Sequence, residues 1–345
     1  MHPLQRECHR LVEAGLPGAF VYRVDTGGAS QFYTAGVADL ATQQSMTPDL
    51  HYRVGSTTKT FTAVVVLQLL AEGKLRLRDT LDKWLPDLPI PNATSLTIEH
   101  LLRMRSGLFD FEDDPSLLGN LDAHRQPYTL EQVLHLSIRH AARFLPGAKY
   151  EFCNTNFCVL ELIIERITGH TLATELTRRI FGPVGMTNST YPDEEDLTLP
   201  EPYIRGYERT PDGWEECSHV FFGRGDGALI STPGDLARFF RALLFERTLL
   251  PDDLLQQMMS VIQDQPPAEE LYGLGLMADP LPSGMVWGHS GGGFGYGNLP
   301  YLQCETGRFV VFMINGSYGF RVSTGNRPMP DRAVRAEAYS KQTDN

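Results

Sequence analysis

The pattern of apolar and polar positions divides the chain into a β-rich beginning, a helical middle and an end in which strands return. Residues 19–24 and 31–37 alternate apolar and polar side chains, and residues 25–28 between them have the composition of a tight turn. They predict a β-hairpin. Residues 285–288 and 309–314 are apolar runs that predict late strands. Because an isolated hairpin is marginal in water, we expect the early and late strands to share one antiparallel sheet.

Helical periodicity dominates the middle of the chain. Residues 156–168 repeat apolar side chains at helical spacing and stop at Gly169, which is typical of a helix followed by its terminator. A later helix is predicted to begin at residues 231–235, which supply a hydroxyl cap and a proline for the first turn. Further helices are predicted at residues 4–14, 97–105, 130–140 and 171–180, and an irregular segment around Pro86, Pro89 and Pro91.

The candidate chemistry begins where a short strand ends at Gly55 and an apolar helix follows, up to Gly73. Ser56 and Lys59 are three residues apart and would be neighbours on a helix. An ammonium group beside a hydroxyl can take its proton or stabilise the alkoxide, provided that burial or another cation lowers the lysine pKa. The amide hydrogens at the helix N-terminus add to this effect. Alternatively, Ser56 is an N-cap and Lys59 a solvated residue, because the pattern S-x-x-K is common.

Composition and charge narrow the classes of function. With 345 residues and 42% apolar side chains, the chain can form one large domain or a core with an inserted subdomain. A net charge of −12 without a dense run of Lys or Arg argues against nucleic acid or an anionic membrane as partner. No stretch approaches the roughly 20 apolar residues that span a bilayer. Residues 1–8 do not resemble a signal peptide, so we expect a cytoplasmic protein unless a leader has been removed.

The cysteines and an acidic run have simple interpretations. Five cysteines are too few for a disulfide framework and lack the spacing of a zinc site, so buried free thiols are expected and no metal site is predicted. They are Cys8, Cys153, Cys158, Cys217 and Cys304. The acidic residues in the run 110–115 predict a solvated loop.

Two further stretches are spaced to complete a site around Ser56. Residues 145–156 form a loop that enters a helix, and residues 287–293 form a strand edge that opens into glycines, which let a backbone approach a ligand closely. With these stretches, the sequence resembles the serine β-lactamase and penicillin-binding protein family, in its class C β-lactamase, DD-carboxypeptidase and esterase branch. The resemblance covers roughly residues 10–320 and rests on motifs in a fixed order: Ser56-Thr57-Thr58-Lys59, Ser106-Gly107-Leu108, Pro146-Gly147, Asn154-Thr155-Asn156, residues 227–232, residues 272–275 and His289-Ser290-Gly291.

The resemblance implies the fold. We expect an α/β (α+β) protein of β-lactamase/transpeptidase-like fold, in which an antiparallel sheet flanked by helices carries an all-helical insertion. Residues 1–78 and 225–345 would form the sheet domain and residues 79–224 a mostly helical subdomain. The site would lie in the cleft between the two parts.

The resemblance also implies roles for individual residues. Ser56 is the expected acylated nucleophile and Lys59 the group that orients it and shuttles its proton. Asn154 would hydrogen-bond Lys59 and the substrate amide, while the backbone amides of Ser56 and Gly292 would form the oxyanion hole. His289, Ser290 and Gly291 would line the site. No cofactor is expected.

One departure from the family pattern concerns catalysis. The proton-transferring tyrosine of the family falls at Phe152, which cannot transfer a proton. Lys59 or His289 would then be the base, with Tyr150 a more remote candidate. Alternatively the chain is a binding protein with a vestigial serine, or the substitution was engineered to trap an acyl-enzyme.

Other departures concern the substrate. The arginine with which peptidase members grip a terminal carboxylate is missing from residues 276–279, so peptidoglycan trimming is disfavoured. Arg224 and Asp226 stand where small residues are usual, either to recognise a polar group or as an ion pair on a loop. Together with Phe152, Tyr150, Ser290 and Gly291 they are the predicted substrate contacts.

The expected function is serine-dependent hydrolysis or transfer of the acyl group of an ester, amide or lactam. The expected substrate is a small, peptide-like or biosynthetic molecule. A non-catalytic binding module and a DD-peptidase-type hydrolase remain as alternatives, and the sequence leaves the oligomeric state open.

Overall fold

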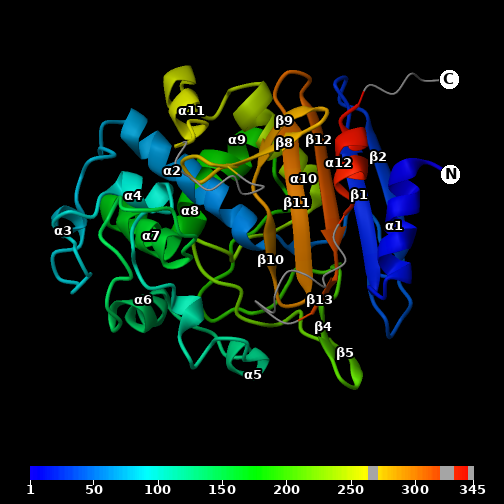
Figure 1. Cartoon of the computed structure of the whole chain (residues 1–345), viewed down its shortest axis with the longest axis horizontal. Coiled ribbons are helices and arrows are strands. Elements are labelled where there is room, and N and C mark those ends of the chain that lie inside the picture. The colour runs from blue at the N-terminus through cyan, green and yellow to red at the C-terminus, as the bar shows by residue number, and fades with distance from the viewer. Residues whose placement is uncertain (263–270, 319–329, 341–345) are drawn as a thin grey trace.

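The computed structural model describes residues 1–262, 271–318 and 330–340, and its central feature is one antiparallel sheet (Figure 1). The strand order is β2-β1-β12-β11-β9-β8-β7, and β10 pairs with β11. The strands are β1 (Gly18–Val24), β2 (Ser30–Gly36), β7 (Leu271–Tyr272), β8 (Met277–Leu281), β9 (Gly284–Gly288), β10 (Gly291–Gly293), β11 (Tyr296–Gln303) and β12 (Arg308–Ile314). In β1, Ala19 lies opposite Ile314 of β12. The prediction that the first hairpin joins the late strands is therefore confirmed.

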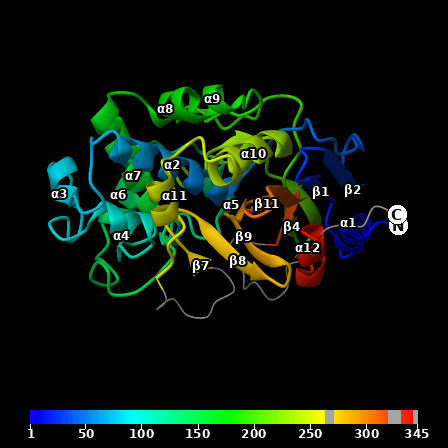
Figure 2. The same ribbon diagram turned by 90° about the horizontal axis from the view of Figure 1, so that it is seen from above.

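Helices cover both faces of this sheet (Figure 2). Successive side chains of a strand point to opposite faces. Ala19 packs with Leu11 of α1 (Pro3–Glu13), whereas Tyr22 faces Gly234 of α10 (Pro233–Phe240). On the α1 side of the sheet, α12 (Arg332–Ala338) lies beside α1. With both faces covered, β12 is buried along its whole length.

A helical group lies beside the sheet and surrounds α2 (Thr58–Ala71), which is buried on nearly all sides. Phe61 of α2 stacks on Phe239 of α10 with ring centres 3.6 Å apart. Two further helices pack on α2, namely α7 (Thr155–Thr168) and α8 (Leu172–Leu176). The remaining helices are α3 (Leu81–Trp84), α4 (Ile98–Leu102), α5 (Leu121–His124), α6 (Leu130–Ile138), α9 (Gly182–Val184) and α11 (Asp252–Met258). The structure also contains the 3₁₀ turns η1 (Gly55–Thr57) and η2 (Phe111–Asp113) and the π-helical segments η3 (Thr177–Phe181) and η4 (Arg241–Phe245).

The predicted insertion is not all helical. Residues 79–224 also contain a hairpin of β4 (Tyr207–Thr210) and β5 (Gly213–Glu216), and β4 pairs in parallel with β13 (Gly316–Ser317). The hairpin strands are only four residues long, which leaves too little alternation to be recognised. A second small pairing joins β3 (Tyr52–Arg53) to β6 (Ile230–Ser231). The domain boundaries themselves stay a prediction, and part of the range 225–345 lies outside the described residues.

Two further features are the cysteines and the absence of a membrane-spanning helix among the described residues. All five cysteines are free; four are buried and Cys304 is half-buried. Within residues 1–262, 271–318 and 330–340, no helix has the length and apolar character needed to cross a membrane.

Candidate active site

Ser56 lies in η1, a single 3₁₀ turn that connects β3 to α2, rather than in the first turn of the α-helix itself. The turn requires glycine at residue 55, where φ is +55°. A Cβ atom there would lie 2.7 Å from the amide nitrogen of Gly292. The backbone of the glycine strand β10 therefore approaches the nucleophile turn closely, and Ser56 and Gly292 border the same cavity. The oxyanion hole formed by the amides of Ser56 and Gly292 stays a prediction, with both residues on the wall of one cavity.

Two side chains tie this turn to the segments before and after β10. Thr57 donates from its hydroxyl to the carbonyl oxygen of His289 at 2.9 Å. Asn298 of β11 donates from its amide to the carbonyl oxygen of Val54 at 2.8 Å. At Gly291 a Cβ would come within 1.9 Å of that same carbonyl oxygen, so no larger residue fits. Fixed backbone donors of this kind need no reorganisation when negative charge develops on a substrate.

Lys59 is fully buried in the first turn of α2, and its ammonium group donates to three hydrogen-bond acceptors. It donates to Ser56 Oγ at 2.9 Å, to Asn154 Oδ1 at 2.7 Å and to the carbonyl oxygen of Asp226 at 2.9 Å. Burial lowers the pKa of Lys59, although the negative charge of neighbouring carboxylates acts in the opposite direction and raises it. The predicted group of Ser56, Lys59 and Asn154 is thus brought together.

Asn154 is oriented by Asp110. Asp110 Oδ2 accepts from the backbone nitrogen of Asn154 at 3.2 Å and from its side-chain Nδ2 at 3.1 Å. The amide nitrogen is thereby directed to Asp110 and the amide oxygen to Lys59. The predicted motifs nearby have a similar supporting role, because Ser106 donates to Asn156 Oδ1 at 2.5 Å.

Phe152 presents the face of its ring to Lys59, with Nζ 4.9 Å from the ring centre. The ring borders the cavity and can stabilise the cation but cannot exchange a proton. Tyr150 instead packs on Tyr272, with ring centres 5.8 Å apart, and is not among the residues that border the cavity.

His289 is fully buried behind Phe152 and does not border the cavity. Its Nδ1 lies 2.7 Å from the carbonyl oxygen of Ser290, which can only accept, so Nδ1 carries the proton. Its Nε2 lies 3.0 Å from the hydroxyl of Tyr272. Burial and the charge of Lys59 lower the pKa of His289 to about 3. His289, which was predicted as an alternative base, is therefore a neutral histidine with both ring nitrogens in hydrogen bonds. The neighbouring Ser290 donates from its hydroxyl to Met277 Sδ at 3.3 Å.

Arg224 and Asp226 point in different directions. Arg224 lies 3.5 Å from Glu161 Oε1 and over the ring of Tyr191, outside the wall of the cavity. Its partner in an ion pair is thus Glu161 of α7, not a substrate group. Asp226 does border the cavity, and its Oδ2 lies 4.0 Å from Lys59 Nζ.

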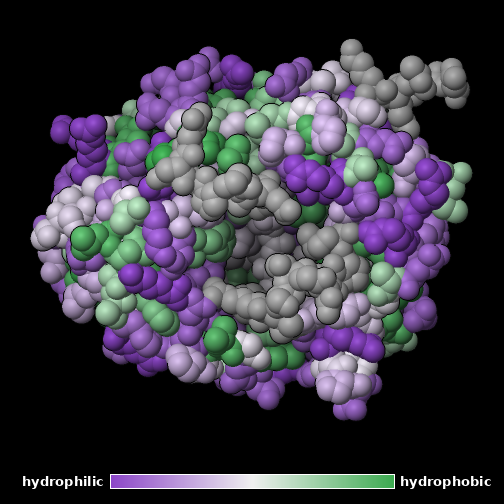
Figure 3. All heavy atoms as spheres, viewed as in Figure 1, coloured by the Kyte–Doolittle hydropathy of each residue, from purple (hydrophilic) through white to green (hydrophobic). Residues whose placement is uncertain are grey.

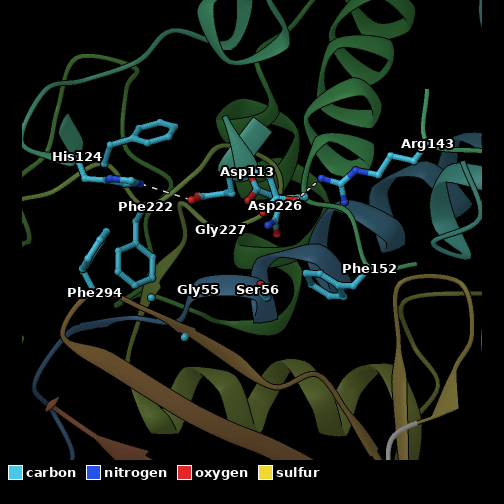
Figure 4. Close-up of a pocket in the computed structure, with 15 residues that line it drawn as sticks. Gly55, Ser56, Asp113, His124, Arg143, Phe152, Phe222, Asp226, Gly227 and Phe294 are labelled. Carbon is cyan, nitrogen blue, oxygen red and sulfur yellow. Dashed lines mark hydrogen bonds and ion pairs between the residues drawn. The ribbon is translucent and has the colours of Figure 1, made fainter. Parts of the chain in front are cut away.

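The cavity has a volume of about 340 Å³ and combines aromatic with acidic walls. Ser56 lies between Phe152 on one side and Phe222 and Phe294 on the other (Figure 4). The face of the molecule seen in Figure 1 is hollowed near its middle, between the helical group and the sheet (Figure 3). Residues of the cavity wall that were not among the predicted site residues are Glu112, Asp113, His124, Arg143, Phe221, Phe222, Gly227, Gly293 and Phe294.

The acidic run at residues 110–115 is not a solvated loop, contrary to the prediction. Asp110, Glu112 and Asp114 are all buried. Asp114 accepts hydrogen bonds from Arg139 and His140, and Asp113 from Arg143. These partners come from segments remote in sequence, so the run itself carried no signal of its burial.

Glu112 is an acidic residue of the cavity wall and could contact a ligand there. Its Oε2 lies 3.5 Å from Nε2 of His124. Within the described part of the chain, this buried oxygen has no partner at hydrogen-bond geometry. A buried acceptor without a donor is costly, so the site favours a ligand that brings one. Among the described residues, no group of three or more His, Cys, Asp or Glu side chains could hold a metal ion.

The fold and the Ser56–Lys59 pair are those of a serine hydrolase. The chain belongs to the beta-lactamase family, because the model of the family described as Beta-lactamase matches residues 4–331.

Two solved enzymes are similar in structure. A D-stereospecific amidohydrolase from Streptomyces sp. is 31% identical, with a TM-score of 0.85 over 98% of this chain and 97% of that one. The D-amino acid amidase from Ochrobactrum anthropi SV3, in complex with L-phenylalanine amide, is 28% identical, with a TM-score of 0.85 over 97% of each chain.

Curated relatives are longer. A D-aminopeptidase from Brucella ovis is 29% identical over 284 residues, which are 80% of this chain but 52% of that protein. The chain thus spans about half the length of this relative. Penicillin-binding protein 4* of Bacillus subtilis is 25% identical over 309 residues, 86% of this chain and 67% of that protein.

Proposed function

We propose that this enzyme cleaves small amides or short peptides of D-amino acids that carry a free amino group, through an acyl-Ser56 intermediate. The observation that carries the proposal is the composition of the cavity wall: the Ser56–Lys59 pair at 2.9 Å, flanked by the buried carboxylate of Glu112 and by aromatic rings. A substrate ammonium group would satisfy Glu112 Oε2. An apolar side chain would pack on Phe222 and Phe294.

The names of the similar proteins support this substrate class, since they include a D-stereospecific amidohydrolase, a D-amino acid amidase and a D-aminopeptidase. The absence of an arginine from residues 276–279 agrees with it, because a substrate with a neutral amide end brings no terminal carboxylate to be gripped.

The reaction needs only groups of this chain. Lys59 takes the proton of Ser56 as Oγ bonds to the substrate carbonyl carbon, and the amides of Ser56 and Gly292 stabilise the oxyanion. The C–N bond then breaks and the leaving amine takes the proton from Lys59. Water, or an acceptor amine in a transfer reaction, releases the acyl group. Because Phe152 cannot assist that second step, the acyl-enzyme accumulates.

Intact-mass spectrometry tests the proposal with D-phenylalanine p-nitrophenyl ester, its L-enantiomer and its N-acetyl derivative. The wild type should gain the mass of one acyl group from the D-ester, and Ser56→Ala should gain none. The L-ester and the N-acetylated ester should react at least tenfold more slowly. Equal labelling by all three esters contradicts the substrate class, and no labelling by any of them contradicts the acyl-enzyme itself.

A non-catalytic binding module is the second candidate, because Phe152 deprives Lys59 of a proton-exchanging neighbour. It predicts saturable binding of D-phenylalanine amide without turnover. Hydrolysis of D-phenylalanine amide by the wild type and by Ser56→Ala distinguishes the two candidates. Equal rates support the binding module, and a faster wild type supports the enzyme.

A further inference from the structure

Asp226 is a buried carboxylate whose position is fixed by the protein rather than by a ligand. It is 4% exposed, and its Oδ1 accepts from the backbone nitrogen of Arg224 at 2.8 Å and from the thiol of Cys158 at 3.2 Å. Its Oδ2 lies 4.0 Å from Lys59 Nζ, and its own carbonyl oxygen accepts from the same nitrogen. Both ends of this residue therefore act on Lys59.

The three acceptors around Lys59 also fit its neutral form. An amine that donates to Asn154 Oδ1 and to the carbonyl oxygen of Asp226 directs its lone pair at Ser56 Oγ. When this amine takes the serine proton, a positive charge forms inside the protein, where water cannot solvate it. A fixed negative charge at 4.0 Å then stabilises the product of the proton transfer.

We propose that Asp226 is a positioning residue of the acyl-transfer reaction, whose carboxylate is the counter-ion that sets the basicity of Lys59. This inference rests on the proposed function, since it assumes that Ser56 is acylated. Asp226 exchanges no proton: the proton of Ser56 passes to Lys59 as the Oγ–C bond forms, and from Lys59 to the leaving amine as the C–N bond breaks. In deacylation, Lys59 takes a proton from water and returns one to Ser56.

Other ionisable groups also face Lys59, and among the charges that act on it Asp226 has the largest effect, followed by Asp110, Cys158 and Glu112. Asp110 accepts two hydrogen bonds from Asn154, and Glu112 faces His124. Cys158 donates to Asp226, and His289 is held neutral. Burial lowers the pKa of Lys59 and raises the pKa of Asp226, while the charge of each opposes the shift in the other. Removal of the Asp226 charge should therefore make Lys59 a weaker base.

The test is the pH profile of acylation in Asp226→Asn, a change that removes the charge and nearly keeps the shape. The probe is p-nitrophenyl acetate, which has no amino group, in single-turnover experiments between pH 5 and 10, a range wide enough for a shift of this size. The midpoint at which acylation becomes fast should move about one to three units to lower pH, because an opposite charge at this distance shifts a pKa by that much. The plateau rate at high pH should fall by about threefold to thirtyfold, so that the two profiles cross.

A purely structural role of Asp226 predicts a different result, namely slower acylation at every pH with an unchanged midpoint, and that result overturns the inference. Asp226→Glu is the second variant, because it keeps the charge and does not depend on the folding of Asp226→Asn. Its midpoint should stay within about half a unit of the wild type, whereas a shift as large as the one expected for asparagine also overturns the inference.

The outcomes separate this inference from the proposed function. If wild-type Ser56 is not acylated by any ester, the proposed function fails. If the wild type is acylated and Asp226→Asn has the wild-type profile, only the counter-ion role fails. A defect confined to D-phenylalanine esters, with p-nitrophenyl acetate unaffected, shows that Asp226 binds the substrate amine and likewise overturns this inference.

Discussion

The ring of Phe152 covers the ammonium group of Lys59 at 4.9 Å from ring centre to Nζ, so that the nucleophile's partner faces an aromatic surface on this side. On its other sides Lys59 contacts Ser56, Asn154 and Asp226. An active site with this arrangement has a nucleophile, an amine and an oxyanion site, but no hydroxyl beside the amine at residue 152. In the proposed mechanism, the missing hydroxyl limits the step in which water must be activated.

Phe152→Tyr should therefore raise the rate at which the acyl-enzyme turns over. The new hydroxyl would lie near Lys59, and general acid–base assistance of this kind contributes about 10²- to 10⁴-fold. Steady-state hydrolysis of D-phenylalanine amide should increase at least tenfold, while the amount of trapped acyl-enzyme in the intact-mass experiment falls. An unchanged rate of deacylation would mean that Lys59 already serves both steps, as in a specialised transferase.

Gly55→Ala should destabilise the protein and impair acylation. The alanine Cβ meets the amide nitrogen of Gly292 at 2.7 Å, in addition to the strain of φ at +55°. Gly73→Ala is the matched control, because Gly73 has φ of +71° but open space around its Cβ position. The control should lose about 1–2 kcal/mol of unfolding free energy, and Gly55→Ala about 1–3 kcal/mol more. Urea denaturation measures both, and equal losses would show that the contact with Gly292 is relaxed at little cost.

The sequence was sufficient for the parts of the molecule whose signals are local. The first hairpin and β12 have clear strand patterns, and Ser56, Lys59 and Asn154 lie in short motifs whose spacing is fixed by the ends of helices. By contrast, β11 was missed because Pro300 and the glycines before it interrupt its strand pattern. Pro300 nevertheless lies within β11, opposite Val311 of β12.

The acidic wall of the cavity could not be predicted for a different reason. A run of carboxylates has the same sequence whether it is solvated or buried. Its burial depends on Arg139, His140, Arg143 and Asn154, which reach Asp114, Asp113 and Asp110 only in the folded chain. His289 shows the converse, since its motif marks a residue near the site while the fold places it behind Phe152.

Glu112→Gln should weaken the binding of substrates that carry an amino group. A hydrogen bond to a charged group is worth about 1.5–3 kcal/mol, so KM for D-phenylalanine amide should rise about tenfold to a hundredfold. KM for the amide of 3-phenylpropionic acid, which lacks the amine, should change little. Asp113→Asn is the control variant, because Asp113 borders the same cavity but is bonded to Arg143. Equal effects of Glu112→Gln on both substrates would assign Glu112 to the structure of the wall.

The pair of His124 and Glu112 should make this binding depend on pH. Burial opposes the charged form of His124, but the attraction of the Glu112 carboxylate 3.5 Å away outweighs it and raises the pKa of His124 above its ordinary value. His124 Nδ1 lies 2.8 Å from the carbonyl oxygen of Asn120, which fixes Nε2 toward the carboxylate. Below the raised pKa the imidazolium neutralises Glu112 and competes with the substrate ammonium group; above it the carboxylate is available.

When the substrate concentration is expressed as its protonated form, because an α-amino group titrates in the same pH range, KM for D-phenylalanine amide should therefore fall as pH rises through the pKa of His124. KM for the analogue without the amine should stay flat. His124→Gln keeps a polar side chain that does not titrate and should remove the pH dependence. The stability of the fold should decrease over the pH range in which substrate binding improves. A raised pKa in the folded state means that protonated His124 contributes stability at low pH, and this contribution is lost as pH rises through the folded pKa. Urea denaturation across the same pH range measures that loss, and a KM that titrates equally in His124→Gln would locate the titrating group elsewhere.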